Sequence, residues 1–277
     1  MAATLEVQRP SASPEPGHRP VVERVIEAMN ERLDERFSLA RLAALAYYSP
    51  FHFHRLFRHV TGVPPGRFFG ALRIEAAKRL LLTSDLSVTQ ICVAVGYHSL
   101  GTFTSQFTRL VGISPRGLRA LARANGSERL STLLAAPFVD PAAKPVIAGR
   151  VEQLDASEGT LAAIGLFPSR LAEGTPAGCT LAPVPGDYEL AASESGSFHV
   201  LALSIDACAS LNDLLLDDGG VHVAATAAPL VVQPGRPVRA DLTLRPRTVT
   251  DPPILLALSL LVGSAGAEDR GRRRAAR

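Results

Sequence analysis

The first half of the chain carries apolar residues three and four positions apart, which is the period of an amphipathic α-helix. The stretch 22–33, with apolar residues at Val22, Ile26, Met29 and Leu33, predicts a supporting helix. Residues 68–82 predict a longer helix, because no helix breaker follows Gly70. We therefore expect one long helix that connects smaller helical units.

The same pattern of residues occurs twice, at an offset of 49 and then of 50 residues. Each copy predicts a short helix that begins after a serine N-cap, a tight turn and a second helix with an apolar inner face. A repeat of this kind defines the architecture of the first half. The matched positions are Ser38, Leu39, Leu42, Ala43, Ala46, Ser49, Phe53, Phe57, Gly62 and Pro65 with Ser87, Val88, Ile91, Cys92, Val95, Ser99, Phe103, Phe107, Gly112 and Pro115.

The two turns differ in their sequence signal. Gly96 ends the first helix of the second copy, as expected of a residue that accepts a positive φ. Tyr47 stands at the corresponding position of the first copy and gives a weaker turn signal. Ser49 and Pro50 then restart the chain as N-cap and first helical residue.

The second half changes period. Short apolar runs alternate with clusters of Gly, Pro, Asp and Ser, which is typical of an antiparallel β-sandwich. We expect a multidomain α + β chain with an all-α double helix-turn-helix domain (19–125), a linker (126–148), a β-sandwich accessory domain (149–247), and a short apolar segment with a disordered basic tail (248–277). The strand candidates are 161–167, 179–184, 188–191, 198–205, 221–225 and 238–244.

Charge separates the two halves. The whole chain of 277 residues carries a net charge of +3. Residues 37–126 contain ten arginines and one lysine against two acidic residues, whereas residues 151–261 contain five arginines against thirteen acidic residues. This asymmetry favours a polyanionic partner for the first half, although a solvated basic face would give the same count.

A helix-turn-helix exposes the start of its second helix to base edges, while nearby arginines neutralise phosphates. In the first copy the outward residues are Phe51, His54, Arg55 and Arg58; Arg55 could donate two hydrogen bonds to guanine and Phe51 could contact a thymine methyl group. In the second copy Thr102, Thr104 and Ser105 offer shorter contacts. Arg109, Arg116, Arg119 and Arg123 are expected to meet phosphates.

Residues 19–125 resemble the DNA-binding domain of the AraC/XylS transcription regulators, through the run 49–57, the run 76–81, and the spaced positions Gly96, Phe103, Phe107, Gly112 and Pro115. The resemblance implies a seven-helix bipartite domain that reads two adjacent major grooves of double-stranded DNA. It points to Phe51, His54 and Arg55 in the first unit as base contacts, and in the second unit to Leu100, Gly101, Thr102, Thr104 and Ser105. Ser105 stands where the family often has a long polar residue, so the second unit is expected to contribute mainly phosphate contacts.

The second half resembles the transthyretin-like, carboxypeptidase-regulatory-type sandwich in its strand pattern and turns. That resemblance implies a binding or assembly module, so a small-molecule effector, RNA polymerase and a second copy of the chain are candidate partners. A competing hypothesis is a ligand- or carbohydrate-binding sandwich for which the DNA-binding domain serves only as localisation.

No catalytic, cofactor or metal site is predicted. The three cysteines are far apart and Cys92 lies in an inward stripe, so we expect it in the core. The longest late apolar run, residues 254–262, is too short to cross a bilayer, and we expect a cytoplasmic protein without a membrane partner.

Overall fold

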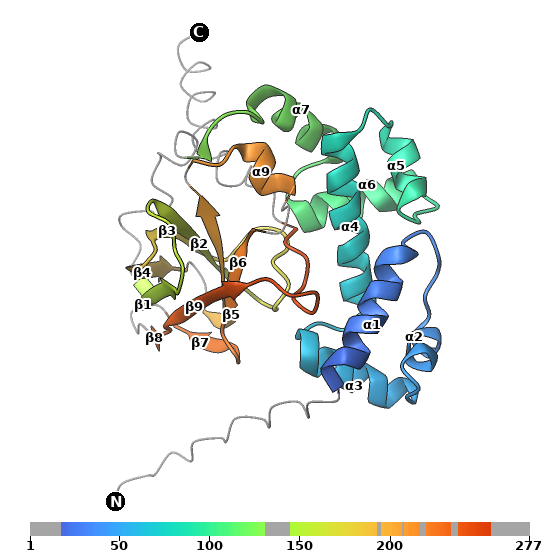
Figure 1. Cartoon of the computed structure of the whole chain (residues 1–277), viewed down its shortest axis with the longest axis horizontal. Coiled ribbons are helices and arrows are strands. Elements are labelled where there is room, and N and C mark those ends of the chain that lie inside the picture. The colour runs from blue at the N-terminus through green and yellow to red at the C-terminus, as the bar shows by residue number, and fades with distance from the viewer. Residues whose placement is uncertain are drawn as a thin grey trace, which may run out of the picture.

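The computed structural model describes residues 18–130, 145–192, 195–206, 208–216, 220–233 and 238–255. A helical part precedes a strand-rich part (Figure 1). The helices are α1 (His18–Glu31), α2 (Leu39–Leu45), α3 (Pro50–Thr61), α4 (Pro65–Thr83), α5 (Val88–Ala94), α6 (Leu100–Val111), α7 (Pro115–Asn125) and α9 (Leu211–Leu216). The strands are β1 (Pro145–Gln153), β2 (Thr160–Phe167), β3 (Cys179–Pro183), β4 (Gly186–Ala191), β5 (Gly196–Asp206), β6 (His222–Ala225), β7 (Leu230–Val232), β8 (Val238–Arg239) and β9 (Leu242–Pro246).

The sequence repeat is confirmed as a repeat of structure. Helices α2 and α3 form the first helix-turn-helix unit and α5 and α6 the second, and α4 connects them. The side chains of Ser38 and Ser87 accept hydrogen bonds from backbone N–H groups in the first turns of α2 and α5, as predicted for N-caps. The packing of aromatic rings in the core is also repeated. The ring centroids of Phe53 and Phe57 are 5.6 Å apart, and those of Phe103 and Phe107 are 5.7 Å apart.

The turn of the first unit uses a residue that seldom takes its backbone conformation. Tyr47 has φ = 58°, and Gly96 at the matched position has φ = 80°. The following residues, Tyr48 and Tyr97, donate equivalent backbone hydrogen bonds to Ala43 and Cys92. The two turns therefore have the same geometry, but only the second has the glycine that adopts it without a steric cost.

Replacing Tyr47 with glycine is expected to stabilise the protein by about 0.5–1 kcal/mol. The left-handed conformation costs a non-glycine residue about 1–2 kcal/mol, and the greater freedom of glycine in the unfolded chain offsets part of that gain. The ring is 91% exposed, so little buried contact is lost. Urea unfolding measures the change, and a lower midpoint for Tyr47→Gly would contradict the strain.

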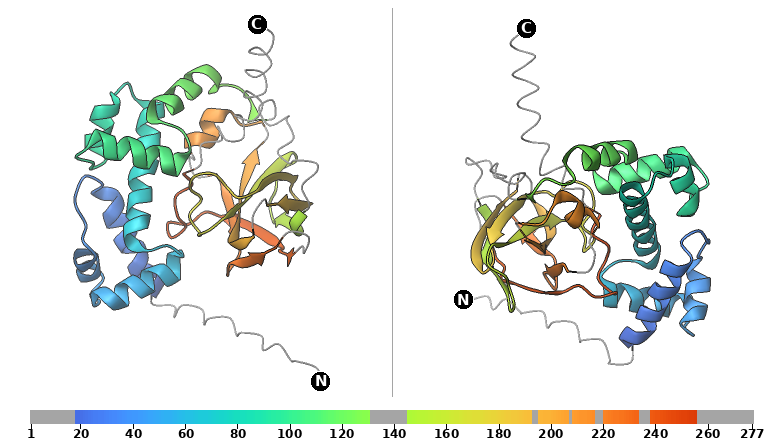
Figure 2. Two further views of the ribbon diagram at one scale, coloured as in Figure 1. Left: turned by 180° about the vertical axis from the view of Figure 1, so that it is seen from behind. Right: turned by 45° about the horizontal axis from the view of Figure 1, so that its top comes forward.

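The strand-rich part forms a mixed sheet in the order β3-β2-β5-β6-β9-β1-β4, with β7 paired to β5 and β8 paired to β1. Five of the six predicted runs each correspond to one observed strand, whereas the run 238–244 is divided between β8 and β9. Strands β1 and β7 and helix α9 were not predicted. Most pairs are antiparallel, but β1 runs parallel to β8 and β9, a departure from the expected antiparallel arrangement. The strands curve around their own core (Figure 2).

The described residues of the segment 126–148, which the sequence predicts as a linker, make contacts with distant parts of the chain. Strand β1 begins at Pro145 and pairs with β4, while Leu130 is fully buried and its backbone N–H donates to Ala209. These partners lie far away in the sequence, so the local composition of the segment could not show them. Residues 131–144, and residues 256–277 of the predicted apolar segment and tail, lie outside the described part of the chain.

Alternate residues of β2 face two different cores. Ala162 and Ile164 belong to the interior of the strand-rich part, while Leu161 and Ala163 pack against the core of the helical part. That second core also contains Leu211 and Leu215 of α9 and the buried Leu255. The helical and strand-rich parts are therefore joined by a continuous apolar contact.

Candidate nucleic-acid interface

Helix α3 presents a basic and aromatic face beside a buried apolar one. Phe53 and Phe57 are fully buried and fix the orientation of the helix. On the other side Phe51 is 76% exposed, Arg55 and Arg58 are exposed, and His54 is half-buried. The outward residues predicted for the first unit thus lie together on one helix, with His54 at the edge of the exposed face.

Arg55 and Phe51 lie in contact on this face. The guanidinium carbon of Arg55 is 5.4 Å from the centroid of the Phe51 ring, which is within the range of a cation–π interaction. The Arg55 side chain contacts the ring and is still exposed to solvent. Such an arrangement suits a planar donor that forms two hydrogen bonds to one base edge.

Helix α6 presents a shorter and less basic face. Leu100 is 43% exposed, Gly101, Thr102 and Ser105 are exposed, and Thr104 is half-buried. At the other end of the helix the side chain of Arg109 is 63% exposed and lies 3.7 Å from the Glu173 carboxylate. This face can offer hydroxyl contacts near its start and a single, partly neutralised positive charge near its end.

The sequence predicts that Arg119 contacts a phosphate, but in the structure its guanidinium is bonded to the backbone of the same domain. Its guanidinium donates to the backbone carbonyls of Leu81, Ser84 and Leu86 and so fixes the loop before α5. Arg73 does the same for the loop before α2, where it donates to Leu33 and Glu35. These two arginines stabilise the loops of the two helix-turn-helix units. This role depends on where the backbone carbonyls lie, so it could not be predicted from the sequence.

Arg123 and Arg116 differ from Arg119. Arg116 is exposed, and Arg123 is an exposed side chain whose guanidinium lies 3.5 Å from Asp85. An exposed pair of this kind contributes little stability and leaves Arg123 accessible to solvent. Tyr47, in the turn before α3, is 91% exposed, so the surface beside α3 carries an aromatic side chain that was not among the predicted contacts. The direction of this side chain depends on the conformation of the turn, so only the structure shows that it is exposed.

Two further side chains of the helical part that could take part in chemistry, His52 and Cys92, pack against neighbouring residues. His52 stacks on Tyr48 with the ring centroids 4.8 Å apart. Cys92 is buried, as expected, and burial raises the pKa of its thiol. Within the described ranges no group of three or more His, Cys, Asp or Glu residues is placed to hold a metal ion. Nor does any helix there combine the length and apolar character that crossing a bilayer requires.

Comparison with known proteins identifies relatives of the helical part. Residues 42–120 match the model of a helix-turn-helix domain. The chain is 40% identical over 95 residues to the MmsAB operon regulatory protein of Pseudomonas aeruginosa, a match that covers 34% of this chain and 31% of that protein. It is 30% identical over 95 residues to the HTH-type transcriptional activator AarP of Providencia stuartii, covering 34% of this chain and 70% of AarP.

Among solved structures, the DNA-binding domain of the global transcriptional factor AdpA, crystallised with a target DNA, is 38% identical, with a TM-score of 0.36; the match covers 37% of this chain and 93% of that domain. The chain spans less than half the length of the first curated relatives that it matches, and the matched segments are about as long as the helical part. The helix-turn-helix match and the coverage of AarP together show that the chain belongs to the AraC/XylS family of helix-turn-helix regulators.

Proposed function

We propose that this protein is a sequence-specific regulator of transcription that inserts α3 and α6 into adjacent major grooves of double-stranded DNA. The observation that carries the proposal is the repeat itself: two matched helices, each with a buried aromatic inner face and an exposed polar start, connected by a single helix, α4. Successive major grooves on one face of DNA are about 34 Å apart, and a rigid connection sets such a spacing.

The proposed contacts differ between the two units. In the first, Phe51, His54 and Arg55 meet base edges and Arg58 meets a phosphate. In the second, Leu100, Gly101, Thr102, Thr104 and Ser105 line the groove with short side chains, and Arg109 contributes to the phosphate contacts. Arg55 is the residue with the greatest capacity to discriminate, because its fork of donors matches the two acceptors of guanine.

The proposed role is non-catalytic and cytoplasmic. It is supported by the transcriptional regulators among the relatives, which also disfavour a sandwich that uses the helical domain only for localisation. RNA polymerase, a small-molecule effector and a second copy of this chain are further proposed partners. Contact with the strand-rich part gives an effector or a second copy a physical route to the DNA-binding part.

Selection of bound sequences from random duplexes tests the proposal. We expect the purified chain to enrich a sequence with two half-sites about 10 base pairs apart, the first more strongly defined than the second. Affinity for that sequence should fall by tenfold or more between about 50 and 200 mM salt, since phosphate contacts release counterions. Weak, salt-insensitive binding without an enriched sequence would refute the proposal.

A further inference from the structure

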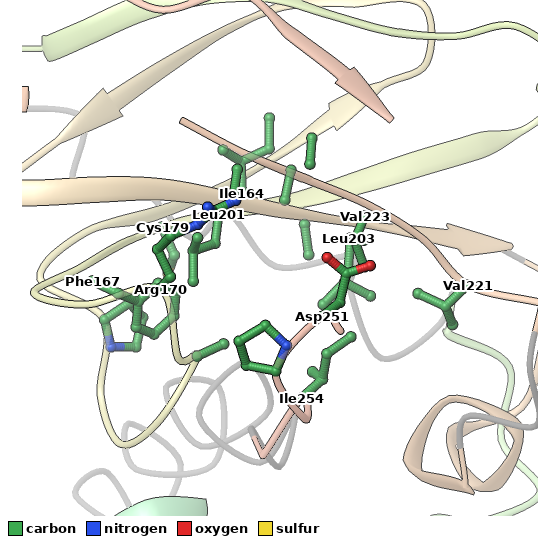
Figure 3. Close-up of a pocket in the computed structure, with 18 of the residues that line it drawn as sticks. Ile164, Phe167, Arg170, Cys179, Leu201, Leu203, Val221, Val223, Asp251 and Ile254 are labelled. Atoms are coloured by element: carbon green, nitrogen blue, oxygen red, sulfur yellow. The ribbon is translucent and has the colours of Figure 1, made fainter. Parts of the chain in front are cut away.

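A cavity of about 130 Å³ lies between the sheet and the helical part. Its lining comes mainly from β2, β3, β5 and β6 and from the segments after β2 and β9, and it includes Lys78 of α4. Most of the lining is apolar, including Leu201, Leu203 and Val223 (Figure 3). Because an apolar cavity of about 150 Å³ can hold benzene, a small ligand fits here.

The charges on the described lining are unbalanced. Lys78, Arg170 and Arg245 are cationic, and Asp251 is the one anionic residue among them. Arg245 donates two hydrogen bonds of 2.7 Å to Asp251, so the charge of Asp251 is already compensated. The cavity therefore combines an apolar wall with excess positive charge.

Arg170 is the cation available to a ligand. Among the described residues, its guanidinium has no hydrogen bond and no carboxylate within 4 Å, whereas Lys78 donates to the backbone carbonyl of Ile254. Burial lowers the pKa of Arg170, and Asp251 opposes that shift from a distance. A half-buried, unpaired guanidinium is costly and gains most from an anionic partner. In Figure 3 Arg170 lies beside Phe167 and Cys179, across the cavity from Val223.

The same stretch of chain touches both recognition helices. The stem of Arg170 packs on Gly62, where α3 ends; a Cβ added to Gly62 would lie 2.4 Å from its Cδ. Glu173 pairs with Arg67 at the start of α4 and with Arg109 of α6. Gly174 donates a backbone hydrogen bond of 2.8 Å to Leu110 of α6. We call residues 170–174 the bridging segment.

We propose that the cavity binds a small monocarboxylate with an apolar body about the size of a benzene ring. The carboxylate pairs with Arg170, and the body lies against Leu201, Leu203 and Val223. Occupancy shifts the bridging segment and thereby changes how α3 and α6 meet DNA. This regulatory step rests on the proposed DNA-binding function, but the ligand site does not.

Calorimetry on the full-length chain without DNA tests the ligand site. The probes are phenylacetate and hexanoate at millimolar concentration, each compared with its neutral amide. We expect each acid to bind about tenfold or more tightly than its amide, since a charge-assisted pair is lost in the amide. Absence of binding, or equal affinities for acid and amide, would overturn the proposal.

Two variants locate the site. Arg170→Met keeps an unbranched stem against Gly62 and should abolish the preference for acid over amide, whereas Arg239→Met, at an exposed arginine of β8, should retain it. Val223→Phe fills the cavity and should abolish binding of both probes, so the site remains testable if Arg170→Met does not fold. Unchanged binding or preference in both cavity variants would show that the probes bind elsewhere.

The regulatory step has a separate readout. Saturating phenylacetate should change the affinity of the chain for its selected duplex by about fivefold or more, which is the usual scale of coupling between sites. The change should disappear in Val223→Phe. If the chain binds the acid and the duplex but neither affects the other, the coupling through the bridging segment is refuted while the ligand site stands.

Discussion

Arg55→Ala is expected to weaken binding to the selected duplex by about 10- to 100-fold, because a bidentate pair with guanine contributes about 1–3 kcal/mol of discrimination. Binding to a random duplex of the same length should fall much less. Selection repeated with the variant should enrich sequences with one position of the first half-site relaxed. Fluorescence anisotropy with labelled duplexes measures both affinities at one salt concentration.

Two matched changes separate base reading from charge. Arg58→Ala removes the same charge from the same exposed face, and as a phosphate contact it should weaken both duplexes alike and reduce the salt slope by about one. Arg239→Ala removes an exposed arginine that pairs with Asp241 in the strand-rich part, and should change neither affinity. If Arg55→Ala behaves like Arg58→Ala, then Arg55 does not read a base.

Gly96→Ala is expected to lower the free energy of unfolding by about 2–5 kcal/mol. The new Cβ would lie 2.4 Å from the carbonyl oxygen of Leu33 and 2.6 Å from the guanidinium of Arg73, at a φ of +80°. The left-handed conformation contributes about 1–2 kcal/mol to this loss and the overpacking about 1–3 kcal/mol. Urea unfolding should show a lower midpoint with an unchanged slope.

Gly70→Ala is the matched control for this change. Gly70 lies within α4, and a Cβ added there meets nothing within 4 Å. Alanine in a helix interior is more favourable than glycine by about 0.5–1 kcal/mol, so the same substitution should raise the midpoint. Destabilisation of similar size in both variants would mean that the contact of Gly96 with the loop before α2 is not the cause.

Most helices of the helical part could be predicted because their signals are local, whereas α7 was expected only through the family resemblance. Serine N-caps, apolar residues on one helix face and the two glycines that end α3 and α6 act within a few residues, and all recur in the repeat. The exposed position of Arg55 follows from the same periodicity. A helix is stabilised by contacts between residues three and four positions apart. Its position and its outward face can therefore be predicted from the sequence.

Tertiary structure alone decided what joins the two parts. Arg119 and Arg123 look alike in sequence, yet only Arg119 donates to three backbone carbonyls. Strand β1 forms only where β4, β8 and β9 supply its hydrogen bonds, and the cavity exists only where Lys78, Arg170 and Asp251 converge. The spacing of apolar and polar residues does not predict such contacts, because they join residues far apart in the sequence and depend on how the backbone folds between them.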